Sequence, residues 1–122
     1  MRLAALAALA SLAALVVVPA HATVAPSRVQ VTAKEFWFAL SRSTVTEGPA
    51  IVELVNFGED PHDMRVKRVG GTKVYRTPLI QPGKFYDLSL KLIPGRYTLW
   101  CSIPTHAGLG MKATLVVRKR TY

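Results

Sequence analysis

The feature that most restricts the fold of this chain is an alternation of apolar and polar residues with a period of two. In the segment FYDLSLKL (85–92), apolar side chains at every second position from Tyr86 to Leu92 alternate with polar ones such as Asp87. The segment KATLVVRK (112–119) alternates in the same way, and so, less regularly, do IVELVNF and RVQVTAKEFWF. This periodicity is typical of β-strands that bury one face.

Turn-forming residues separate these segments at short intervals: Glu47-Gly48-Pro49, Gly70-Gly71, Gln81-Pro82-Gly83-Lys84 and Ile93-Pro94-Gly95. No uninterrupted segment shows the spacing of a full-length helix, although a short helical turn fits between residues 72 and 81. We therefore expect an all-β fold, with about seven short strands in two packed antiparallel sheets that form a β-sandwich. The strands nearest to the chemistry discussed below are predicted at 51–57, 62–69, 96–102 and 111–119.

The first 22 residues have the pattern of a secretory signal peptide. Arg2 supplies a positive charge, residues 3–18 form a run that is apolar except for Ser11, and Ala20-His21-Ala22 places small residues where a signal peptidase cuts. The run of sixteen residues is shorter than the roughly 20 that a membrane-spanning helix needs. We expect cleavage before Thr23 rather than an uncleaved membrane anchor. The mature protein is then a single domain, 23–122, that is periplasmic or extracellular.

The mature chain is strongly basic. Without Arg2 it has fifteen lysines and arginines against seven acidic residues, a net charge of +8. Such a field favours encounter with acidic partners. The basic residues are scattered along the sequence rather than gathered on one element, and VRKRTY at the C-terminus is their one run. We therefore expect an acidic protein partner rather than nucleic acid or anionic lipid.

The single cysteine, Cys101, lies in the segment WCSIPTHAGLGM (100–111). An exported domain of this size often relies on disulfides, but a lone cysteine cannot form one internally. Stability must then come from the apolar core or from a bound metal. Considered by itself, a cysteine in an apolar strand is most often a small core residue.

His106 and Met111 follow Cys101 at equal offsets of five residues. On a helix these offsets would turn the three side chains away from one another. On a continuous strand, Cys101 and His106 would point to opposite faces. A loop that folds back on itself brings all three together, and the proline and glycines of this segment favour such a bend.

A thiolate, an imidazole and a thioether suit copper better than any hard cation, and a blue-copper site adds one more histidine to such a set. Once His21 leaves with the signal peptide, the remaining histidine is His62, in NFGEDPHDMRV. It follows a turn at the start of a predicted strand, which puts it at an end of the sandwich where loops gather. Two methionines have a plainer interpretation: Met111 could pack in the core, and packing explains Met64 better than metal binding.

Two stretches of the chain resemble the small cupredoxins, the type 1 copper proteins of the plastocyanin and azurin kind. NFGEDPHD (56–63) is similar to the family's Asn-x-Gly segment that leads into its first histidine. PGRYTLWCSIPTHAGLGM (94–111) is similar to its Pro-Gly-x-Tyr-x-aromatic-x-Cys strand and the Cys, His, Met loop that follows. The resemblance covers about residues 29–119, and its loop spacing resembles that of rusticyanin and the phytocyanins more than that of plastocyanin.

The resemblance implies a Greek-key β-sandwich that holds one copper ion. It assigns the copper to three equatorial ligands and one axial methionine: His62, Cys101, His106 and Met111. It also implies that Asp63 bridges the two ligand segments, with its backbone N–H near the cysteine sulfur. Asn56 and Tyr97 would have structural roles.

The same resemblance implies a soluble one-electron carrier that cycles between Cu(II) and Cu(I) and is not an enzyme. The His106 imidazole would then be the electron port, surrounded by an apolar docking patch of Ile103, Pro104, Ala107 and Leu109. An acidic cytochrome, oxidase or reductase would dock there. We expect a monomer with no stable membrane insertion after signal cleavage.

Three other classes of protein stay open. A copper carrier or storage protein would use similar ligands, but the methionine or histidine clusters expected on its mobile segments are not seen. An oxidase or reductase would need a further metal centre with more histidines, and the binuclear centre of respiratory oxidase subunits needs two cysteines in its loop. A metal-free adhesion sandwich is the last alternative.

Overall fold

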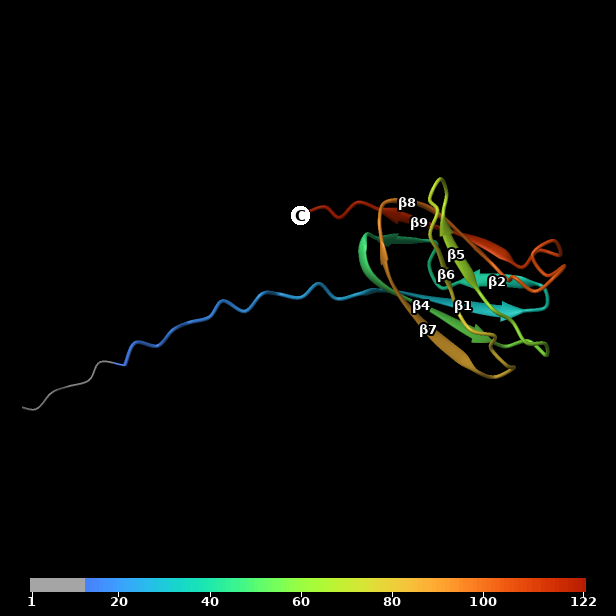
Figure 1. Ribbon diagram of the computed structural model, residues 1–122, viewed down its shortest axis with the longest axis horizontal. Helices are drawn as coiled ribbons and strands as arrows, with labels where there is room; N and C mark the ends of the chain where they lie inside the picture. The colour runs from blue at the N-terminus through green and yellow to red at the C-terminus, as the bar shows by residue number, and fades with distance from the viewer. Residues whose placement is uncertain (1–12) are drawn as a thin grey trace, which may run out of the picture.

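The computed structural model describes residues 13–122 of the chain, and this part forms nine β-strands and no helix. The strands are β1 (Ser27–Lys34), β2 (Trp37–Leu40), β3 (Thr44–Thr46), β4 (Gly48–Asn56), β5 (Arg65–Arg68), β6 (Val74–Arg76), β7 (Phe85–Leu92), β8 (Gly95–Trp100) and β9 (Lys112–Arg118). They build two sheets that pack face to face (Figure 1). The expected all-β sandwich is confirmed.

Both sheets are mixed rather than purely antiparallel, which corrects the expectation from sequence. One sheet has the order β2-β1-β4-β7 and the other the order β3-β9-β8-β5-β6. β1 runs parallel to β4, and β3 runs parallel to β9. Alternation with a period of two reports which face of a strand is buried, and it is the same for parallel and antiparallel neighbours. The sequence pattern therefore carried no information on this point.

Three elements differ from their predicted form. The segment RVQVTAKEFWF, predicted as one strand, is a hairpin of β1 and β2 that turns at residues 35–36. Residues 74–76 form the edge strand β6, paired with β5, in place of a helical turn. His62 precedes β5 and forms an isolated bridge with Ile80. These changes leave His62 where it was expected, at an end of the sandwich.

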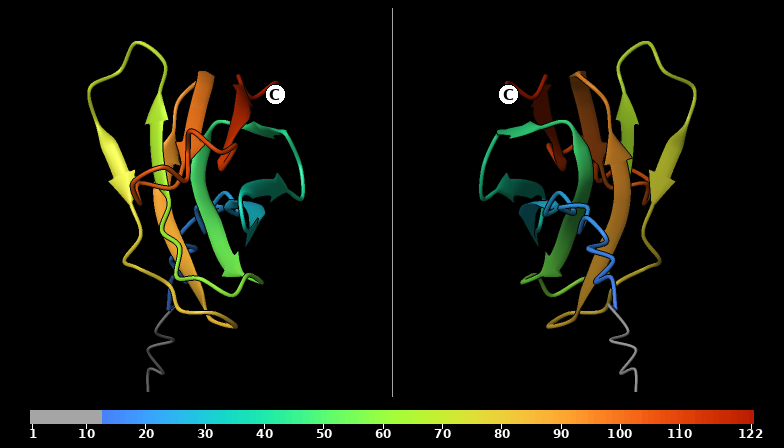
Figure 2. Two further views of the ribbon diagram at one scale, coloured as in Figure 1. Left: turned by 90° about the vertical axis from the view of Figure 1, so that its right-hand side faces the viewer. Right: turned by 90° about the vertical axis from the view of Figure 1, so that its left-hand side faces the viewer.

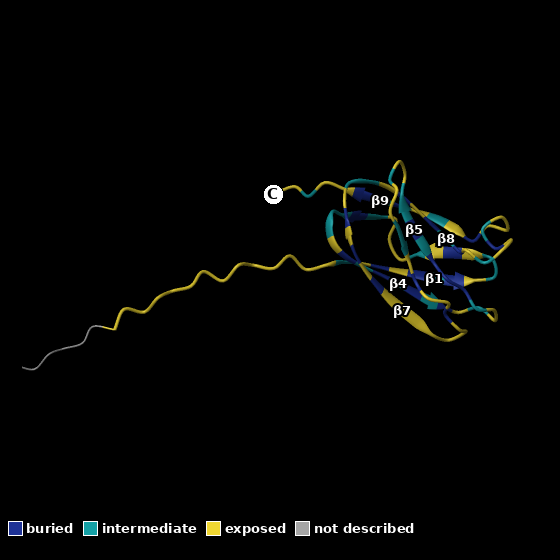
Figure 3. Cartoon of the chain, viewed as in Figure 1, coloured by how far each residue is buried: buried dark blue, intermediate teal, exposed yellow. Residues whose placement is uncertain are grey.

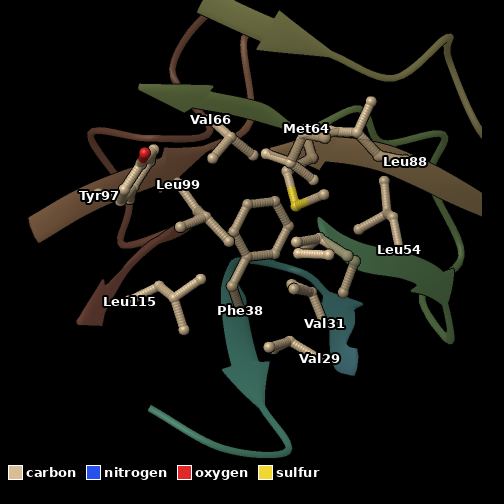
Figure 4. Close-up of a cluster of buried hydrophobic side chains, with 14 of the residues drawn as sticks. Val29, Val31, Phe38, Leu54, Met64, Val66, Leu88, Tyr97, Leu99 and Leu115 are labelled. Carbon is tan, nitrogen blue, oxygen red and sulfur yellow. The ribbon is translucent and has the colours of Figure 1, made fainter. Parts of the chain in front are cut away.

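Apolar side chains from both sheets fill the space between them. Alternate residues along β4 are buried, from Ala50 to Asn56, and Figure 3 shows the same alternation in other strands. The fully buried Met64 side chain lies among core residues such as Leu54 and Leu88 (Figure 4). The interpretation of Met64 as a packing residue is confirmed.

Residues 13–26 form no strand and are exposed. They extend away from the end of the sandwich that is opposite to the 101–111 loop (Figure 1). Residues 1–12 of the predicted signal peptide lie outside the described part of the chain, so the signal, its cleavage and the domain boundary at residue 23 stay predictions. From residue 13 onward, the chain contains no helix with the length and hydropathy required to span a membrane.

Candidate metal centre

Residues 101–111 connect β8 to β9 as a compact loop at one end of the sandwich, seen face-on in Figure 2, left. Backbone hydrogen bonds close this loop: the Cys101 N–H donates to the Met111 carbonyl (3.1 Å), and the Met111 N–H donates to the His106 carbonyl (3.1 Å). A further turn is made where the His106 N–H donates to the Ile103 carbonyl (3.1 Å). The predicted fold-back is confirmed, and it holds the backbones of Cys101, His106 and Met111 together.

Three side chains able to bind a metal meet at this end of the molecule. One ligand atom from each of His62, Cys101 and His106 lies within 4.8 Å of the other two. The Cys101 Sγ is 3.7 Å from the His106 Nδ1, and the two imidazole centroids are 5.2 Å apart. Atoms that bind one cation at about 2.0–2.3 Å lie about 3–4 Å from one another. A small contraction of this cluster would therefore enclose an ion.

The two ring nitrogens of the fully buried His62 have different surroundings. The Nε2 atom lies 2.8 Å from the Glu35 Oε1, within hydrogen-bond distance. The Nδ1 atom is buried and has no hydrogen-bond partner. A buried polar atom left unpaired costs about 1–3 kcal/mol, and a cation bound at this nitrogen would remove that penalty. Together with the sulfur donor nearby, this arrangement fits copper.

Glu35, in the turn between β1 and β2, fixes the His62 ring. Its Oε1 accepts hydrogen bonds from the backbone N–H groups of Glu59 and Asp60, both at 2.9 Å. The Asp60 hydrogen bond is the main reason that the pKa of Glu35 lies at about 2 instead of 4.5, with smaller contributions from Glu59 and His62, while partial burial acts in the opposite direction. A Cβ atom at Gly58 would collide with this carboxylate, so the glycine permits its close approach.

Sequence analysis missed Glu35. It lies 27 positions before His62 in the chain, inside a segment that the alternation predicts to be a plain strand. No signal in the sequence marks this contact, because it depends on the parallel register of β1 and β4, in which Ala33 lies opposite Asn56. This register brings the turn after β1 beside the segment that leads to His62.

Cys101 is buried, with 1% of its surface exposed. Burial raises the pKa of its thiol above the ordinary value of 9.0, and the negative charge of Asp63 adds to this rise, which the backbone N–H groups of Asp63 and Ile103 partly offset. The position of the Asp63 N–H near the sulfur stays a prediction. Because the buried thiol keeps its proton in the metal-free protein, a cation must displace that proton to bind the thiolate.

The Asp63 carboxylate connects the two segments that carry the clustered residues. It accepts hydrogen bonds from the Ser102 N–H (2.7 Å) and from the Ser102 hydroxyl. The Arg65 guanidinium lies 3.3 Å from the same carboxylate. The bridge expected of Asp63 is confirmed, and it ties the residue after His62 to the residue after Cys101.

Asn56 and Tyr97 have the structural roles that the resemblance implied. The Asn56 side chain donates hydrogen bonds to the carbonyls of Asp60 (2.8 Å) and Ile80 (2.9 Å) and accepts one from the Gly58 N–H (2.8 Å). The Tyr97 hydroxyl accepts a hydrogen bond from a backbone N–H four residues earlier (3.1 Å). Asn56 thus holds the turn that leads to His62.

Met111 and His106 occupy different depths at the site. Met111 is fully buried and belongs to the core cluster as well as to the closed base of the loop. His106 has 9% of its surface exposed, against 0% for His62, and the Phe36 ring packs edge-on against it with centroids 4.8 Å apart. His106 is therefore the clustered histidine that lies nearer to solvent.

Solved structures with a similar fold include blue copper proteins. Auracyanin from Roseiflexus castenholzii is 17% identical, with a TM-score of 0.62 over 77% of this chain and 98% of auracyanin. Auracyanin A from Chloroflexus aurantiacus, described as a blue copper protein, is 15% identical, with a TM-score of 0.62 over 77% of this chain and 100% of its own. At these identities the likeness shows the fold alone.

A similar fold also occurs inside a larger protein. The blue copper oxidase from Nitrosomonas europaea is 18% identical, with a TM-score of 0.59 over 80% of this chain but 40% of the oxidase. No curated protein matches this chain.

A family model described as copper binding proteins, plastocyanin/azurin family, matches residues 13–118. The match spans both segments that meet at the His62, Cys101 and His106 cluster. The family binds copper, and copper is also the metal that two imidazoles and a thiolate favour. This chain therefore belongs to the plastocyanin/azurin family of copper binding proteins, and copper is its cofactor.

Proposed function

We propose that this protein is an exported one-electron carrier that holds one copper ion between His62, Cys101, His106 and Met111. The observation that carries the proposal is the buried, unpartnered Nδ1 of His62 in the cluster with the Cys101 sulfur and the His106 ring. Two imidazoles and a thiolate, with a more distant thioether, form the donor set of an electron-transfer site. Bound copper supplies a one-electron couple between Cu(II) and Cu(I).

The surroundings of the site support electron transfer because they fix the ligands on two sides. The Glu35 carboxylate holds the His62 ring, and the Asp63 carboxylate ties the residue after His62 to Ser102. Contacts of this kind orient metal ligands. Ligands that are held in place before the metal changes its oxidation state move little during the transfer, and this lowers the energy needed for reorganisation.

An enzymatic role is less well supported. Among residues 13–122, the His, Cys, Asp and Glu side chains form one cluster of metal-binding geometry, with two histidines in it. The chain spans 40% of the blue copper oxidase to which it is similar. The proposal is therefore a carrier that binds no substrate of its own.

A copper carrier or storage protein is the second candidate. Such a protein should release its metal readily, whereas the clustered side chains here are 0%, 1% and 9% exposed. Deep burial slows the entry of a chelator, so the geometry favours retention of the metal. We expect a strong Cu(I) chelator to remove copper slowly, over hours. Complete transfer of the copper to the chelator within seconds would favour the copper carrier or storage protein.

The electron port in this proposal is the His106 edge, with an acidic redox protein docking at the apolar loop around it. Leu109 in this loop is 59% exposed. Replacing Leu109 with Glu should slow electron transfer to such a partner without changing the visible spectrum. An unchanged transfer rate would count against docking at this loop.

The decisive experiment is a titration of the metal-free mature chain with Cu(II), followed by visible spectroscopy and by cycles of reduction and reoxidation. We expect an intense blue band at one copper per chain that disappears and returns through the cycles. A Cys101→Ser variant should lose the band, and a Met64→Leu variant should keep it, because Met64 lies in the core. A wild-type protein that stays colourless would refute the proposal.

A further inference from the structure

The outer face of the five-stranded sheet gathers basic residues that lie far apart in the sequence. Residues paired in register point to the same side of a sheet. In the row nearest the metal centre, Arg65 pairs with Arg76 on one side and with Trp100 on the other, and Trp100 pairs with Lys112. The next rows along the same face bring in Lys67, Arg96 and Arg118.

This surface, called the basic face below, carries basic residues among uncharged ones. Its six cations are Arg65, Lys67, Arg76, Arg96, Lys112 and Arg118. At the register positions of this face, from β6 across to β3, no residue is acidic. Arg65 alone of the six lies within 4 Å of a carboxylate of the described residues, that of Asp63.

The outer face of the other sheet is different because it carries acidic as well as basic residues. There the Arg28 guanidinium lies 3.9 Å from the Asp87 carboxylate, and the Gln30 amide donates a hydrogen bond to the Glu53 carboxylate (2.9 Å). The excess positive charge of the chain is therefore concentrated on one side of the sandwich. The basic residues are scattered in the sequence because no strand supplies more than two of the six.

The basic face reaches the metal centre. Trp100, which lies between Arg65 and Lys112 in the first row, is bonded to Cys101. The guanidinium of Arg65 also contacts Asp63 and the Ser102 hydroxyl, beside the cysteine segment (3.3 Å for each contact). A molecule seated on this row would therefore lie within one residue of the cysteine in the cluster.

We propose that the basic face is the docking surface for an acidic redox protein, in addition to the apolar loop around His106. This inference rests on the proposed electron-carrier function and adds where the partner binds and why it must be acidic. Six cations, of which only Arg65 lies beside a carboxylate of the described residues, steer an anionic surface toward this side of the molecule. From strand rise and spacing, the basic face measures roughly 20 Å along the strands and 14 Å across them. A surface of this size fits the smaller interfaces of transient redox complexes.

A protein partner is favoured over a membrane or nucleic acid because the basic face is continuous with the metal centre. The half-buried Trp100 at the middle of the first row adds an aromatic contact of the kind enriched in protein interfaces. A redox partner that covers the row nearest the cluster comes close to the metal centre, and a short distance favours electron transfer. A lipid or a phosphate backbone would gain only from the charge.

The test compares two variants of equal charge, both in the copper-loaded mature protein. The first replaces three residues of the basic face with glutamine: Lys67, Arg96 and Lys112. The control replaces three exposed lysines of the other sheet and its turns: Lys34, Lys84 and Lys91. Electron transfer from a reduced c-type cytochrome of strongly acidic surface is followed by stopped-flow absorbance at low and high ionic strength.

We expect the basic-face variant to transfer electrons about tenfold more slowly than wild type at low ionic strength, and the control less than twofold more slowly. The difference should vanish at high salt. Equal slowing of both variants, or none in either, would overturn the proposal. So would vesicles of phosphatidylglycerol and phosphatidylcholine that bind the wild type through these residues while the cytochrome rates stay unchanged.

Two controls separate this proposal from the proposed function. The visible spectrum and the rate of reduction by uncharged hydroquinone should be the same in wild type and both variants. If the wild type shows no copper band and no reversible reduction, the electron-carrier function itself fails. If both are present but the variants do not differ, the docking surface alone fails.

Discussion

Replacing Glu35 with glutamine should destabilise the metal-free protein by about 2 kcal/mol at pH 7. The Glu35 Oε1 accepts hydrogen bonds from the Glu59 and Asp60 backbone and lies 2.8 Å from the His62 Nε2. Glutamine has nearly the same shape and keeps one oxygen acceptor, so the change removes the negative charge rather than the packing. The charge is what strengthens hydrogen bonds of this kind.

The magnitude follows from the pKa of Glu35. A fall of this pKa from 4.5 to about 2 in the folded state corresponds to at most about 3 kcal/mol of folding stability. The Glu35 side chain is 25% exposed, and solvent screening reduces this value. A loss of about 2 kcal/mol is the result.

The sign of the pH dependence provides a second check. Because folding lowers the pKa of Glu35, its contribution is complete above about pH 4.5 and is lost as the pH falls through about 2. Urea unfolding of wild type and Glu35→Gln at several pH values should therefore give curves that converge below pH 4.5. The matched control is Glu53→Gln, whose carboxylate accepts a hydrogen bond from Gln30 at an exposed position.

The control variant should lose less than about 0.5 kcal/mol. If Glu35→Gln loses no more than Glu53→Gln at pH 7, the carboxylate does not anchor the site as described. A difference between wild type and Glu35→Gln that persists unchanged at pH 2 would contradict the assignment of the effect to charge.

Three more results follow from the contacts around the cluster. Asn56→Ala should cost about 2–3 kcal/mol in urea unfolding, because it removes the three hydrogen bonds that this buried side chain makes with Asp60, Ile80 and Gly58; a loss under 1 kcal/mol would argue against this role. Gly58→Ala should displace the Glu35 carboxylate. The double variant with Glu35→Gln should therefore lose less stability than the sum of the two single variants, whereas additive losses would show that the two residues act independently. In the metal-free protein, iodoacetamide should alkylate Cys101 more slowly at pH 7 than it alkylates a free cysteine, and the rate should rise as the pH passes 9, because burial raises the thiol pKa.

The sequence was informative wherever the chemistry is local. Cys101, His106 and Met111 are read from one loop, and the turn before His62 places it at a strand end, so the cluster follows from residue type and spacing. The role of Asp63 came from the resemblance to the small cupredoxins, through its position beside His62. Each of these inferences needed neighbours within about ten residues in the chain.

The sequence was silent where a feature depends on how strands pair. The Glu35 contact to His62 requires the parallel register of β1 and β4. The basic face requires the order β9-β8-β5-β6, in which residues such as Arg76 and Lys112 enter one row. Alternation identifies the outward side of each strand but not its neighbours. Pairing across sheets is a property of the whole chain, and residue patterns do not encode it locally.

The closed base of the 101–111 loop has a consequence for how this protein can change. Because the Cys101 N–H is bonded to the Met111 carbonyl, the two ends of the loop are clamped by the strands that flank them. The Met111 N–H is bonded in turn to the His106 carbonyl. Insertions or deletions between His106 and Met111 would therefore alter the reach and shape of the exposed tip without moving the anchor points. The loop tip that contacts a partner can therefore change in sequence and length while the residues of the metal centre stay in place.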